Sequence, residues 1–274
     1  MRLHRFYINK NIEIGKEIRI DDSEFLNQWG RVFRLKSGDK IILFNGNGFE
    51  YEAHFKILSK KEAVLIIDKE NDPCLSASSP HESASPEVHL FQSVIKKDNF
   101  ELIVQKCTEI GVSAFHPIIS ERSEKKDLNI ERLVKIAKEA SEQSGKVKLP
   151  KIFEPESLEK AIENFSGELF VLDFDGEPFS SLSFLRRQES ILASSTAPAS
   201  ECHNHPVSQT QHPSSTEAGI QSKRIAALVG PEGGWSDKER EFFKQKGIKS
   251  VSLGKQVLRA ETAAIAVSAI ILLK

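Results

Sequence analysis

Residues 253–263 read Leu-Gly-Lys-Gln-Val-Leu-Arg-Ala-Glu-Thr-Ala and follow a short run of β-branched residues near the end of the chain. An earlier loop, Leu-Val-Gly-Pro-Glu-Gly-Gly at 228–234, ends a similar run. A strand, a glycine-rich loop and then a helix present backbone amides to a small ligand in open α/β sheets. Two such loops in succession predict one ligand pocket, with the arginine and the glutamate of the second loop beside it.

Short apolar runs and helical patterns alternate from residue 88 to the end of the chain. The runs that predict strands are 88–94, 114–119, 169–172, 225–229 and 250–253. A final helix is expected from about Glu261. Because strands that alternate with helices form parallel sheets, the pattern predicts an α/β fold.

Capping residues mark the ends of three further helices. Asp98 is expected to cap one helix, which Gly111 closes. Apolar residues at helical spacing over 129–144, followed by Gly145, predict a second. The segment Ser236–Glu239 has the form of a capping box and opens a third.

The first part of the chain, residues 1–72, has a β pattern. An apolar run at 40–44 leads through Asn-Gly-Asn-Gly at 45–48 into an alternating run at 49–55, which is the usual hairpin signal. Another strand is predicted at 63–67. The Gly-x-Gly of the turn lacks the third glycine and the following helix of a nucleotide-binding loop, so the turn interpretation is preferred. These short strands predict a small β-barrel.

Two segments interrupt this organisation. Residues 73–87 are rich in Ser, Pro and Ala and predict a linker, so the domains are expected at 1–72 and 88–274. Residues 183–222 have no sustained periodicity, and their composition predicts a disordered insertion without function. A partner-binding tail is the alternative for this second segment.

Composition restricts the class of protein. The net charge of −1 gives no global basic field, so a surface that binds nucleic acid has to be local. The start of the chain has no apolar signal region, and the apolar run 263–273 is too short to span a bilayer, which favours a buried helix. We therefore expect a cytoplasmic protein that does not associate with membranes.

The three cysteines, at 74, 107 and 202, show no framework spacing. An odd count of this kind predicts a reducing compartment and no disulfides. Cys202-His203-Asn204-His205, with His212 beyond, resembles a cluster of metal ligands. Because no helix or strand is predicted there to fix ligand geometry, we expect no metal site.

The paired loops exclude two common ligand sites. The chain has no G-x-x-x-x-G-K-[ST], and no G-x-G-x-x-G follows a predicted strand. Pro231 also removes one backbone amide from the first loop, which leaves few donors for a pyrophosphate. Two close backbone turns are better suited to the edge of a flat heterocycle such as adenine.

The residues of both loops resemble those of a known family. The motifs at 229–234 and 253–263 together are similar to those of the 16S ribosomal RNA uridine-N3 methyltransferases (RsmE type) of the SPOUT, or α/β-knot, superfamily. Further similar stretches lie at 105–112, 120–123, 139–145 and 30–39. The resemblance covers nearly the whole chain except 73–87 and 183–222. One N-terminal motif departs from the family pattern, because Gln28 follows Asn27 where a histidine is usual and Phe33 replaces a leucine.

The resemblance implies a trefoil-knot methyltransferase domain behind a small PUA-like RNA-binding β-barrel, a homodimer, and one uridine of 16S ribosomal RNA in the small ribosomal subunit as substrate. It also implies that S-adenosylmethionine is bound by the loops at 228–234 and 253–259. The residues expected to bind this cofactor are Leu172, Leu228, Val229, Gly230, Glu232, Gly233, Leu253, Gly254, Val257 and Leu258.

Methylation at N3 of uridine sets requirements for catalytic residues. N3 carries a proton at neutral pH, and its loss moves negative charge onto O2 and O4, which a guanidinium can stabilise. We expect Arg259 to do this, with pairing to Glu261 as the alternative. A base is needed as well, and Glu121 and Glu261 both remain candidates. Arg122 is expected to orient a phosphate or the opposite subunit, and Glu232 to favour the sulfonium or to order its own loop.

Basic residues cluster in the small β domain. Arg5, Arg31, Arg34 and Lys36 are expected to neutralise RNA phosphates, although solvated surface charges are the alternative for each. Two rival functions remain: a non-catalytic RNA-binding protein whose knot has lost its cofactor, and a methyltransferase of the same superfamily that acts on another RNA.

Overall fold

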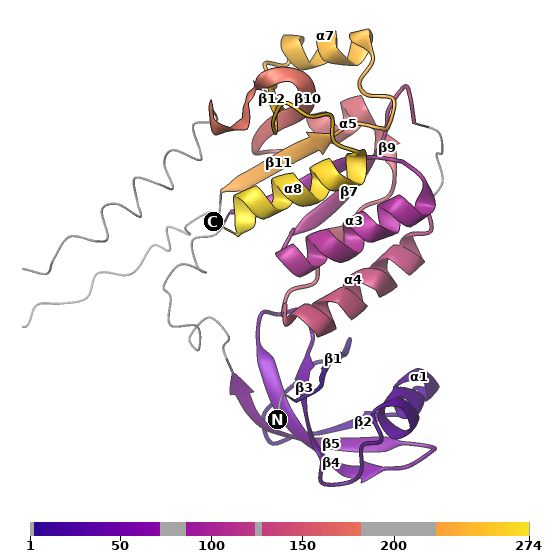
Figure 1. Ribbon diagram of the computed structural model, residues 1–274. Coiled ribbons are helices and arrows are strands. Elements are labelled where there is room, and N and C mark those ends of the chain that lie inside the picture. Colours follow the sequence, from indigo (N-terminus) through magenta and orange to yellow (C-terminus); the bar gives the residue numbers. More distant parts are fainter. Residues whose placement is uncertain (1–2, 72–85, 124–127, 182–222, 274) are drawn as a thin grey trace, which may run out of the picture.

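The computed structural model describes residues 3–71, 86–123, 128–181 and 223–273 (Figure 1). These residues form two sheets, a five-stranded one near the N-terminus and a seven-stranded one in the rest of the chain. The predicted insertion at 183–222 and the cluster Cys202–His205 lie outside the described residues, as does nearly all of the predicted linker. No helix within the described ranges is long and apolar enough to cross a membrane.

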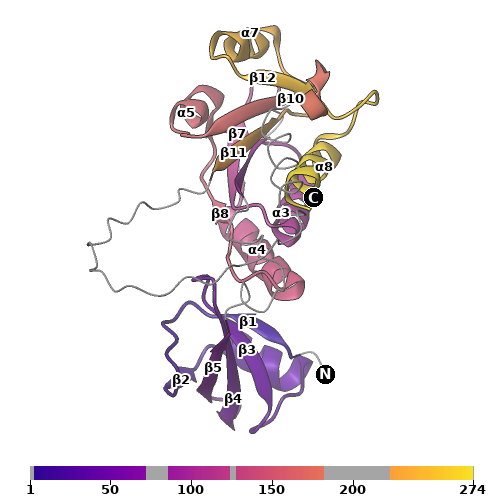
Figure 2. The ribbon, with the colours of Figure 1, turned by 90° about the vertical axis from the view of Figure 1, so that its left-hand side faces the viewer.

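The N-terminal sheet curls into a half-barrel (Figures 1 and 2). Its strands, in spatial order, are β1 (Arg5–Tyr7), β3 (Lys40–Phe44), β4 (Glu50–Leu58), β5 (Ala63–Asn71) and β2 (Glu17–Ile20). The predicted hairpin is present as the antiparallel pair β3 and β4, whereas β1 runs parallel to β3. Helix α1 (Ser23–Asn27) and the wide turn η1 (Gln28–Val32) bring Trp29, fully buried, into the core of the sheet.

The second sheet is parallel, as the alternating pattern predicts. Its strands are β6 (Glu87–Ser93), β7 (Ala114–Ile119), β8 (Lys151–Ile152), β9 (Glu156–Ser157), β10 (Glu168–Pro178), β11 (Arg224–Val229) and β12 (Lys249–Ser252). The spatial order is β12-β10-β11-β6-β7-β8, with β9 beside β7, and every pairing is parallel. The carboxyl ends of β10, β11 and β12 therefore meet at one edge of the sheet.

Helices cover both faces of this sheet (Figure 2). The helices are α3 (Lys97–Ile110), α4 (Ile130–Ser144), α5 (Leu158–Glu163), α7 (Asp237–Gln245) and α8 (Ala260–Leu272), with a short turn η3 (Phe179–Ser181) after β10. One buried cluster joins α3, α4 and α8 to the strands, and a second joins α5 and α7 to them. The central strands β6, β7 and β11 are consequently buried on both sides, which explains their continuous apolar runs.

Most of the predicted helix ends agree with the structure, and one is wrong. Gly111 and Gly145 adopt left-handed conformations after α3 and α4, and Ser236 and Glu239 form the complete capping box of α7. The residue predicted to cap α3, Asp98, lies instead in its first turn, because the helix begins two residues earlier than expected with Lys96 as N-cap. A carboxylate in the first turn still stabilises the helix dipole, and this mimics a capping signal in the sequence.

Strand β10 is much longer than the apolar run that predicts it. The strand pairs with β12 at Leu172, skips four residues, and pairs again at Glu177, both times opposite Val251. A Cβ added to Gly176 would lie 2.6 Å from the backbone of Val251. The close approach of β10 to β12 at this irregularity therefore needs a glycine. The chain then runs from β12, at the edge of the sheet, back to α8 beside α3 and β6. This return of the chain end belongs to the knotted α/β fold, a rare exception to unthreaded connections.

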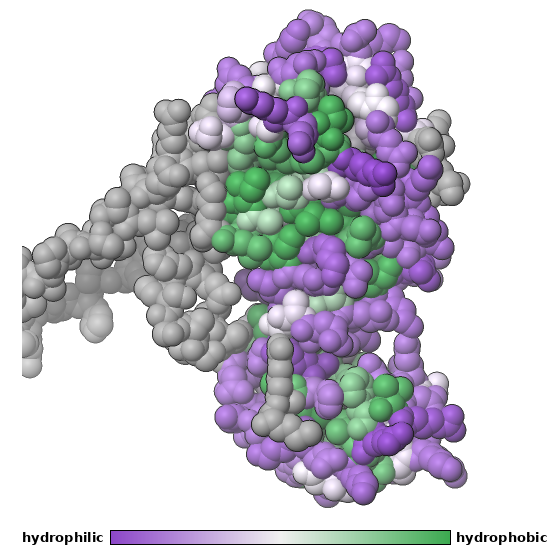
Figure 3. Space-filling model, in the orientation of Figure 1, coloured by the Kyte–Doolittle hydropathy of each residue, from purple (hydrophilic) through white to green (hydrophobic). Residues whose placement is uncertain are grey.

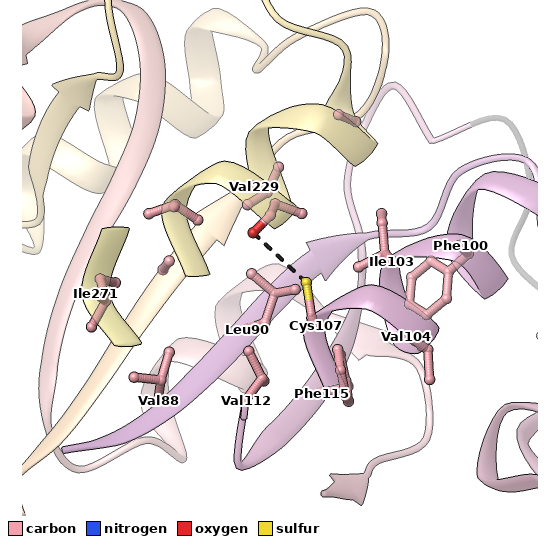
Figure 4. Packing of buried hydrophobic residues seen from close by; sticks show 14 of the residues in the cluster. Val88, Leu90, Phe100, Ile103, Val104, Cys107, Val112, Phe115, Val229 and Ile271 are labelled. Carbon is pink, nitrogen blue, oxygen red and sulfur yellow. Dashed lines mark hydrogen bonds between the residues drawn. The ribbon is translucent and has the colours of Figure 1, made fainter. Parts of the chain in front are cut away.

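Helices α3 and α8 pack side by side over the sheet (Figure 4). Cys107 of α3 lies fully buried between them, with Sγ 3.7 Å from the carbonyl oxygen of Ala264 and 3.6 Å from Oγ of Ser268. Burial raises the pKa of the Cys107 thiol to about 12. This cysteine is therefore a small apolar packing residue and not a nucleophile.

Strand β1 joins the two sheets by contacting the end of α4. The Arg5 guanidinium forms an ion pair with Glu50 and donates to the carbonyl oxygen of Gly145 at 3.0 Å. The backbone N–H of Tyr7 donates to Glu142 at 2.9 Å. Desolvation raises the pKa of the half-buried Glu142, an effect that this hydrogen bond opposes. A cation at the carboxyl end of α4 also complements the helix dipole.

Candidate functional site

A cavity of about 740 Å³ opens where β10, β11 and β12 end. This position, outside the carboxyl ends of parallel strands, is where open α/β sheets bind ligands. The cavity is lined by Lys96, Asn99, Leu172, Asp173, Phe174, Val229, Gly230, Pro231, Glu232, Gly233, Gly234, Trp235, Arg240, Val251, Ser252, Leu253, Gln256, Val257, Leu258, Arg259, Ala260, Glu261 and Ala263. Both glycine loops thus contribute to a single pocket, as predicted.

The first loop, residues 230–235, is held in place from several directions. It closes as a turn, in which Gly234 N–H donates to the carbonyl oxygen of Pro231 at 2.9 Å. The Arg122 guanidinium donates to the carbonyl oxygen of Gly233 at 2.9 Å and to that of Trp235 at 3.4 Å. Because these bonds come from the segment after β7, the loop is fixed by a residue from a more distant strand end of the same sheet.

Trp235 holds the first loop from beneath. Its indole is buried, and its ring N–H donates to the carbonyl oxygen of Leu172 at 2.9 Å, which ties the loop to the middle of β10, where the pairing with β12 is interrupted. A Cβ added to Gly230 would lie 3.0 Å from the indole. The glycine is therefore required by close approach to Trp235. Sequence reasoning missed this tryptophan, although its place directly before the capping box of α7 marks it as the last residue of the loop.

The second loop, residues 253–259, has much less support. Ser252 Oγ donates to the carbonyl oxygen of Gly254 at 2.8 Å, and the described part of the chain gives residues 253–258 no backbone–backbone hydrogen bond. Val257 is 79% exposed and Leu258 is 37% exposed, although both line the cavity. Apolar side chains left in water beside a pocket are a surface that a ligand or a second chain covers.

Arg259 and Glu261 lie at the start of α8, beside the second loop. Arg259 is the N-cap residue, and among the described residues it forms no ion pair, so the alternative of pairing with Glu261 is not observed. Glu261 lines the same cavity, and its Oε2 atom is buried without a hydrogen-bond partner. A buried carboxylate oxygen without a partner is costly unless a ligand satisfies it.

Three further charged side chains of the cavity have partners. Arg240 of α7 forms an ion pair with Asp173 in the middle of β10, at 3.0 Å. Glu232 accepts a hydrogen bond from the side-chain amide of Asn99 at 3.4 Å. This bond attaches the first loop to the start of α3, so α3 also belongs to the site.

The predicted cofactor residues are nearly all at the cavity. Leu172, Val229, Gly230, Glu232, Gly233, Leu253, Val257 and Leu258 line it. Leu228 does not, because it is fully buried on the face of the sheet that packs against α5 and α7. Gly254 lies within the second loop next to lining residues, with φ of +157°. The lining residues Lys96, Asn99, Phe174 and Arg240 were not predicted, since α3 and the extension of β10 come from distant parts of the chain.

The four predicted catalytic residues separate into two groups. Arg259 and Glu261 line the cavity, whereas Glu121 and Arg122 do not. The backbone N–H of Glu121 donates to Glu239 of α7 at 2.9 Å, which places Glu121 beside the start of that helix. Arg122 lies behind the first loop and contacts its carbonyl groups.

The predicted RNA-binding residues also separate. Arg31, at the end of η1, and Arg34 and Lys36, directly after it, are all exposed, and Arg34 has a positive φ of 55°, which is uncommon outside glycine. The side chain of Arg5 is only 10% exposed, because it lies between Glu50 and the end of α4.

The aromatic surface of this segment was missed by sequence reasoning. His4 packs against Phe33, with ring centroids 4.3 Å apart, and Val32 beside them is 70% exposed. Gln28, which stands in the place of the family's usual histidine, is half-buried in η1.

The parallel sheet, the return of α8 to α3 and the cavity between two loops at the strand ends define the class of protein, a SPOUT-type α/β-knot methyltransferase with a half-barrel at its N-terminus. The family comparison makes the class specific. The profile of the RNA methyltransferase domain matches residues 81–272, and that of the RNA methyltransferase PUA domain matches residues 30–68. The chain therefore belongs to the RNA methyltransferase family with an N-terminal PUA domain.

Named relatives share most of the chain. It is 27% identical to "Ribosomal RNA small subunit methyltransferase E" of Rickettsia conorii over 97% of this chain and 93% of that protein. It is 30% identical to the protein of the same name from Bacillus subtilis over 87% of this chain and 84% of that protein.

Solved structures share the fold. That of the ribosomal RNA small subunit methyltransferase E from Neisseria gonorrhoeae, bound to S-adenosyl methionine, superimposes with a TM-score of 0.76 at 24% identity over 98% and 96% of the two chains. A methyltransferase from Legionella pneumophila, in complex with the same cofactor, gives 0.74 at 22% identity over 99% and 97%.

Proposed function

We propose that this protein transfers a methyl group from S-adenosylmethionine to N3 of one uridine in 16S ribosomal RNA of the small ribosomal subunit. The observation that carries the proposal is the cavity in which both glycine loops and an unpaired Arg259 meet. The relatives named as small-subunit ribosomal RNA methyltransferases, which align over nearly the whole chain, support the choice of RNA.

The cavity fits S-adenosylmethionine. Its volume is that of a site for a nucleoside-sized ligand, and backbone from two turns lines it. The carboxylate oxygen of Glu261 that is buried without a partner suits a cofactor with a positive sulfonium and a positive amino group. S-adenosylmethionine, when bound, supplies an electrophilic methyl group. The protein's own residues then have to hold the uracil, accept its N3 proton and stabilise the negative charge that remains on the base.

Arg259 is proposed to stabilise the uracil anion. The residue is exposed at the mouth of the cavity, and the described residues leave its guanidinium without an ion pair, so it is free to contact O2 or O4 of the base. Removing one such charge-stabilising donor from an active site costs about 100-fold or more in rate. The amino end of α8, which Arg259 precedes, adds a positive dipole at the same place.

The proton of N3 requires a base, for which two candidates remain. Glu261 lies in the cavity beside Arg259 and has one unsatisfied oxygen. Glu121 lies outside this chain's cavity, so it could serve only in a site that a second chain completes. The position of Glu261 makes it the better candidate. We assign Arg122 a positioning role, because it contacts the backbone of the first loop.

The N-terminal half-barrel is proposed to bind the RNA strand. Arg31, Arg34 and Lys36 project from one exposed segment, where they can neutralise phosphates. We no longer assign Arg5 to this surface, because its guanidinium is used to join β1 to α4.

A homodimer is proposed as the working form. Apolar surface gathers over α8 in the space-filling view (Figure 3). This helix carries apolar residues all round, and those left incompletely covered are Ala263, Ile265, Ile270, Leu272 and Leu273. A helix of this kind is normally buried, so a second copy of the chain is the proposed cover. A cytoplasmic location is proposed as well, because the named relatives act on ribosomal RNA of the small subunit.

The experiment is a methyl-transfer assay with isotope-labelled cofactor on assembled small subunits, naked 16S ribosomal RNA and transfer RNA. We expect transfer to ribosomal RNA, and N3-methyluridine at a single position after nuclease digestion. Transfer to transfer RNA alone would favour the second rival function. Cofactor binding without transfer to any RNA, or no cofactor binding at all, would contradict the proposal and favour a non-catalytic RNA-binding protein.

A further inference from the structure

The helices that begin at the cavity differ from the others in how they start. Helices α1, α4, α5 and α7 are capped by the side chains of Asp22, Asn129, Ser157 and Ser236, each of which accepts a backbone hydrogen bond. Helices α3 and α8 have Lys96 and Arg259 at the N-cap position, with no side-chain cap hydrogen bond. Their first N–H groups therefore need another acceptor, and both of these N-cap residues line the cavity.

The two lysines at the start of α3 are placed differently. Lys96 is exposed, lines the cavity together with Asn99, and forms no ion pair with any described residue. Lys97 lies 3.8 Å from Glu101 on the surface of α3 and does not line the cavity. These two adjacent lysines therefore differ in access to the site and in the ion pair that only Lys97 forms among the described residues.

None of the described acidic residues of the cavity forms an ion pair with Lys96. Of the cavity's cations, Arg240 is neutralised by Asp173, which leaves Lys96 and Arg259. The planar guanidinium of Arg259 can pair with fixed oxygens such as those of a uracil ring, and the ammonium of Lys96 is a point charge on a flexible stem that can reach a phosphate. A target uridine that enters the cavity brings a phosphodiester on each side of its ribose.

We propose that Lys96 is a substrate-binding residue that neutralises a phosphodiester beside the target uridine at the mouth of the cavity. The proposal rests on the function proposed above. The methionine carboxylate of the cofactor is the other anion of suitable charge, and the open amino end of α3 would accept either anion. The exposure of Lys96 favours the RNA.

The test compares Lys96→Ala with the matched control Lys97→Ala and with the conservative variant Lys96→Arg, all as full chains. The KM for small subunits, kcat and the salt dependence of RNA binding are measured, together with the Kd of S-adenosylmethionine by calorimetry. For Lys96→Ala we expect a KM increase of about tenfold, a kcat within about twofold, and a log–log salt slope smaller by about 0.7 to 0.9. The Kd of the cofactor should not change in Lys96→Ala. The variants Lys96→Arg and Lys97→Ala should match the wild type in all of these measurements.

Two results would overturn the inference. An unchanged KM and salt slope in an active Lys96→Ala enzyme would show that no RNA phosphate is bound there. A weaker cofactor Kd with an unchanged salt slope would assign Lys96 to the methionine carboxylate. Failure of the proposed function is a separate result, because it would appear as no methyl transfer by the wild type to any of the three RNAs, and the inference would fail with it.

Discussion

The two loops of the cavity come from the same kind of strand end, yet they are supported very differently. The first loop is closed by its own turn, contacted by Arg122, and held by a buried Trp235. The second loop has one serine contact at its start and leaves Val257 and Leu258 in water. One wall of the pocket is therefore preformed, and the other is left for a ligand or a second chain to complete.

This difference separates two tasks. A preformed wall lowers the entropy lost when the cofactor binds. A loosely supported wall that carries Arg259 can adjust to the RNA base, and segments with few buried contacts are the ones that open locally. We infer that changes in the first loop affect cofactor affinity, whereas changes in the second affect turnover.

The largest expected effect is that of Arg259→Ala. Turnover should fall by at least about 100-fold, because the charge on the uracil oxygens loses its partner. Cofactor affinity should stay within about tenfold, or about 1.4 kcal/mol, because the first loop is unchanged. Single-turnover methylation and calorimetry on the same preparation provide both numbers. Methylation near the wild-type rate would remove Arg259 from the mechanism.

The glycines of the two loops provide the next contrast. Gly230→Val should abolish cofactor binding, because its Cβ would lie 3.0 Å from the indole of Trp235 and the preformed wall would have to move. A Cβ at Gly254 would meet nothing within 4 Å, although its φ of +157° strains any other residue. Strain of this kind costs on the order of 1–3 kcal/mol, so Gly254→Val should weaken binding by a smaller factor. Equal Kd values for the two variants, measured by calorimetry, would contradict the difference between the loops.

A smaller effect is expected for Arg122→Ala. The variant loses charge-assisted bonds to the carbonyl oxygens of Gly233 and Trp235, each worth about 1.5–3 kcal/mol at most, so the Kd of the cofactor should rise about tenfold. The kcat at saturating cofactor should change little, because Arg122 contacts backbone and not the reacting atoms. A large fall in kcat with an unchanged Kd would instead place Arg122 in the chemistry, and its partner would then be the RNA or a second chain.

The smallest effect is that of Asn99→Ala. Its bond to Glu232 is long, at 3.4 Å, and the first loop keeps its other supports. We expect a Kd change of at most about fivefold, from roughly 1 kcal/mol or less for a neutral donor. A fluorescence titration of Trp235 is sufficient to detect it, with Asn129→Ala, which removes the cap of the distant helix α4, as a control for stability alone.

The sequence was sufficient to predict the parts of this site that depend on local pattern. Both glycine loops, the parallel sheet and the capping box at Ser236 follow from residues close together in the chain. The short strands β1 and β2 were missed, because strands of three or four residues are too short to show a recognisable alternation of apolar and polar residues. The extension of β10 was missed for a different reason. Apart from Phe174, residues 173–178 are polar or turn-forming, and Glu177 and Pro178 pair only because β12 lies beside them.

Contacts between distant residues could not be predicted. Arg5 has the appearance of an RNA-binding cation in the sequence, and only the docking of β1 on α4 shows that Glu50 and Gly145 use its charge. The same holds for Lys96, whose access to the cavity depends on how α3 packs against α8. Local patterns indicate which residues carry charge, whereas tertiary packing decides which of those charges are free.

The difference between the loops can be tested most directly by amide hydrogen exchange on the wild-type protein, with and without S-adenosylmethionine. We predict that the amides of Gly234 and Ser236, whose N–H groups have acceptors in the free protein, are protected before the cofactor is added and change little. Those of 255–258 should exchange rapidly and become protected when it binds. Two results would contradict this difference between the loops. One is equal protection of both loops in the free protein, and the other is no gain of protection in the second loop when the cofactor is added.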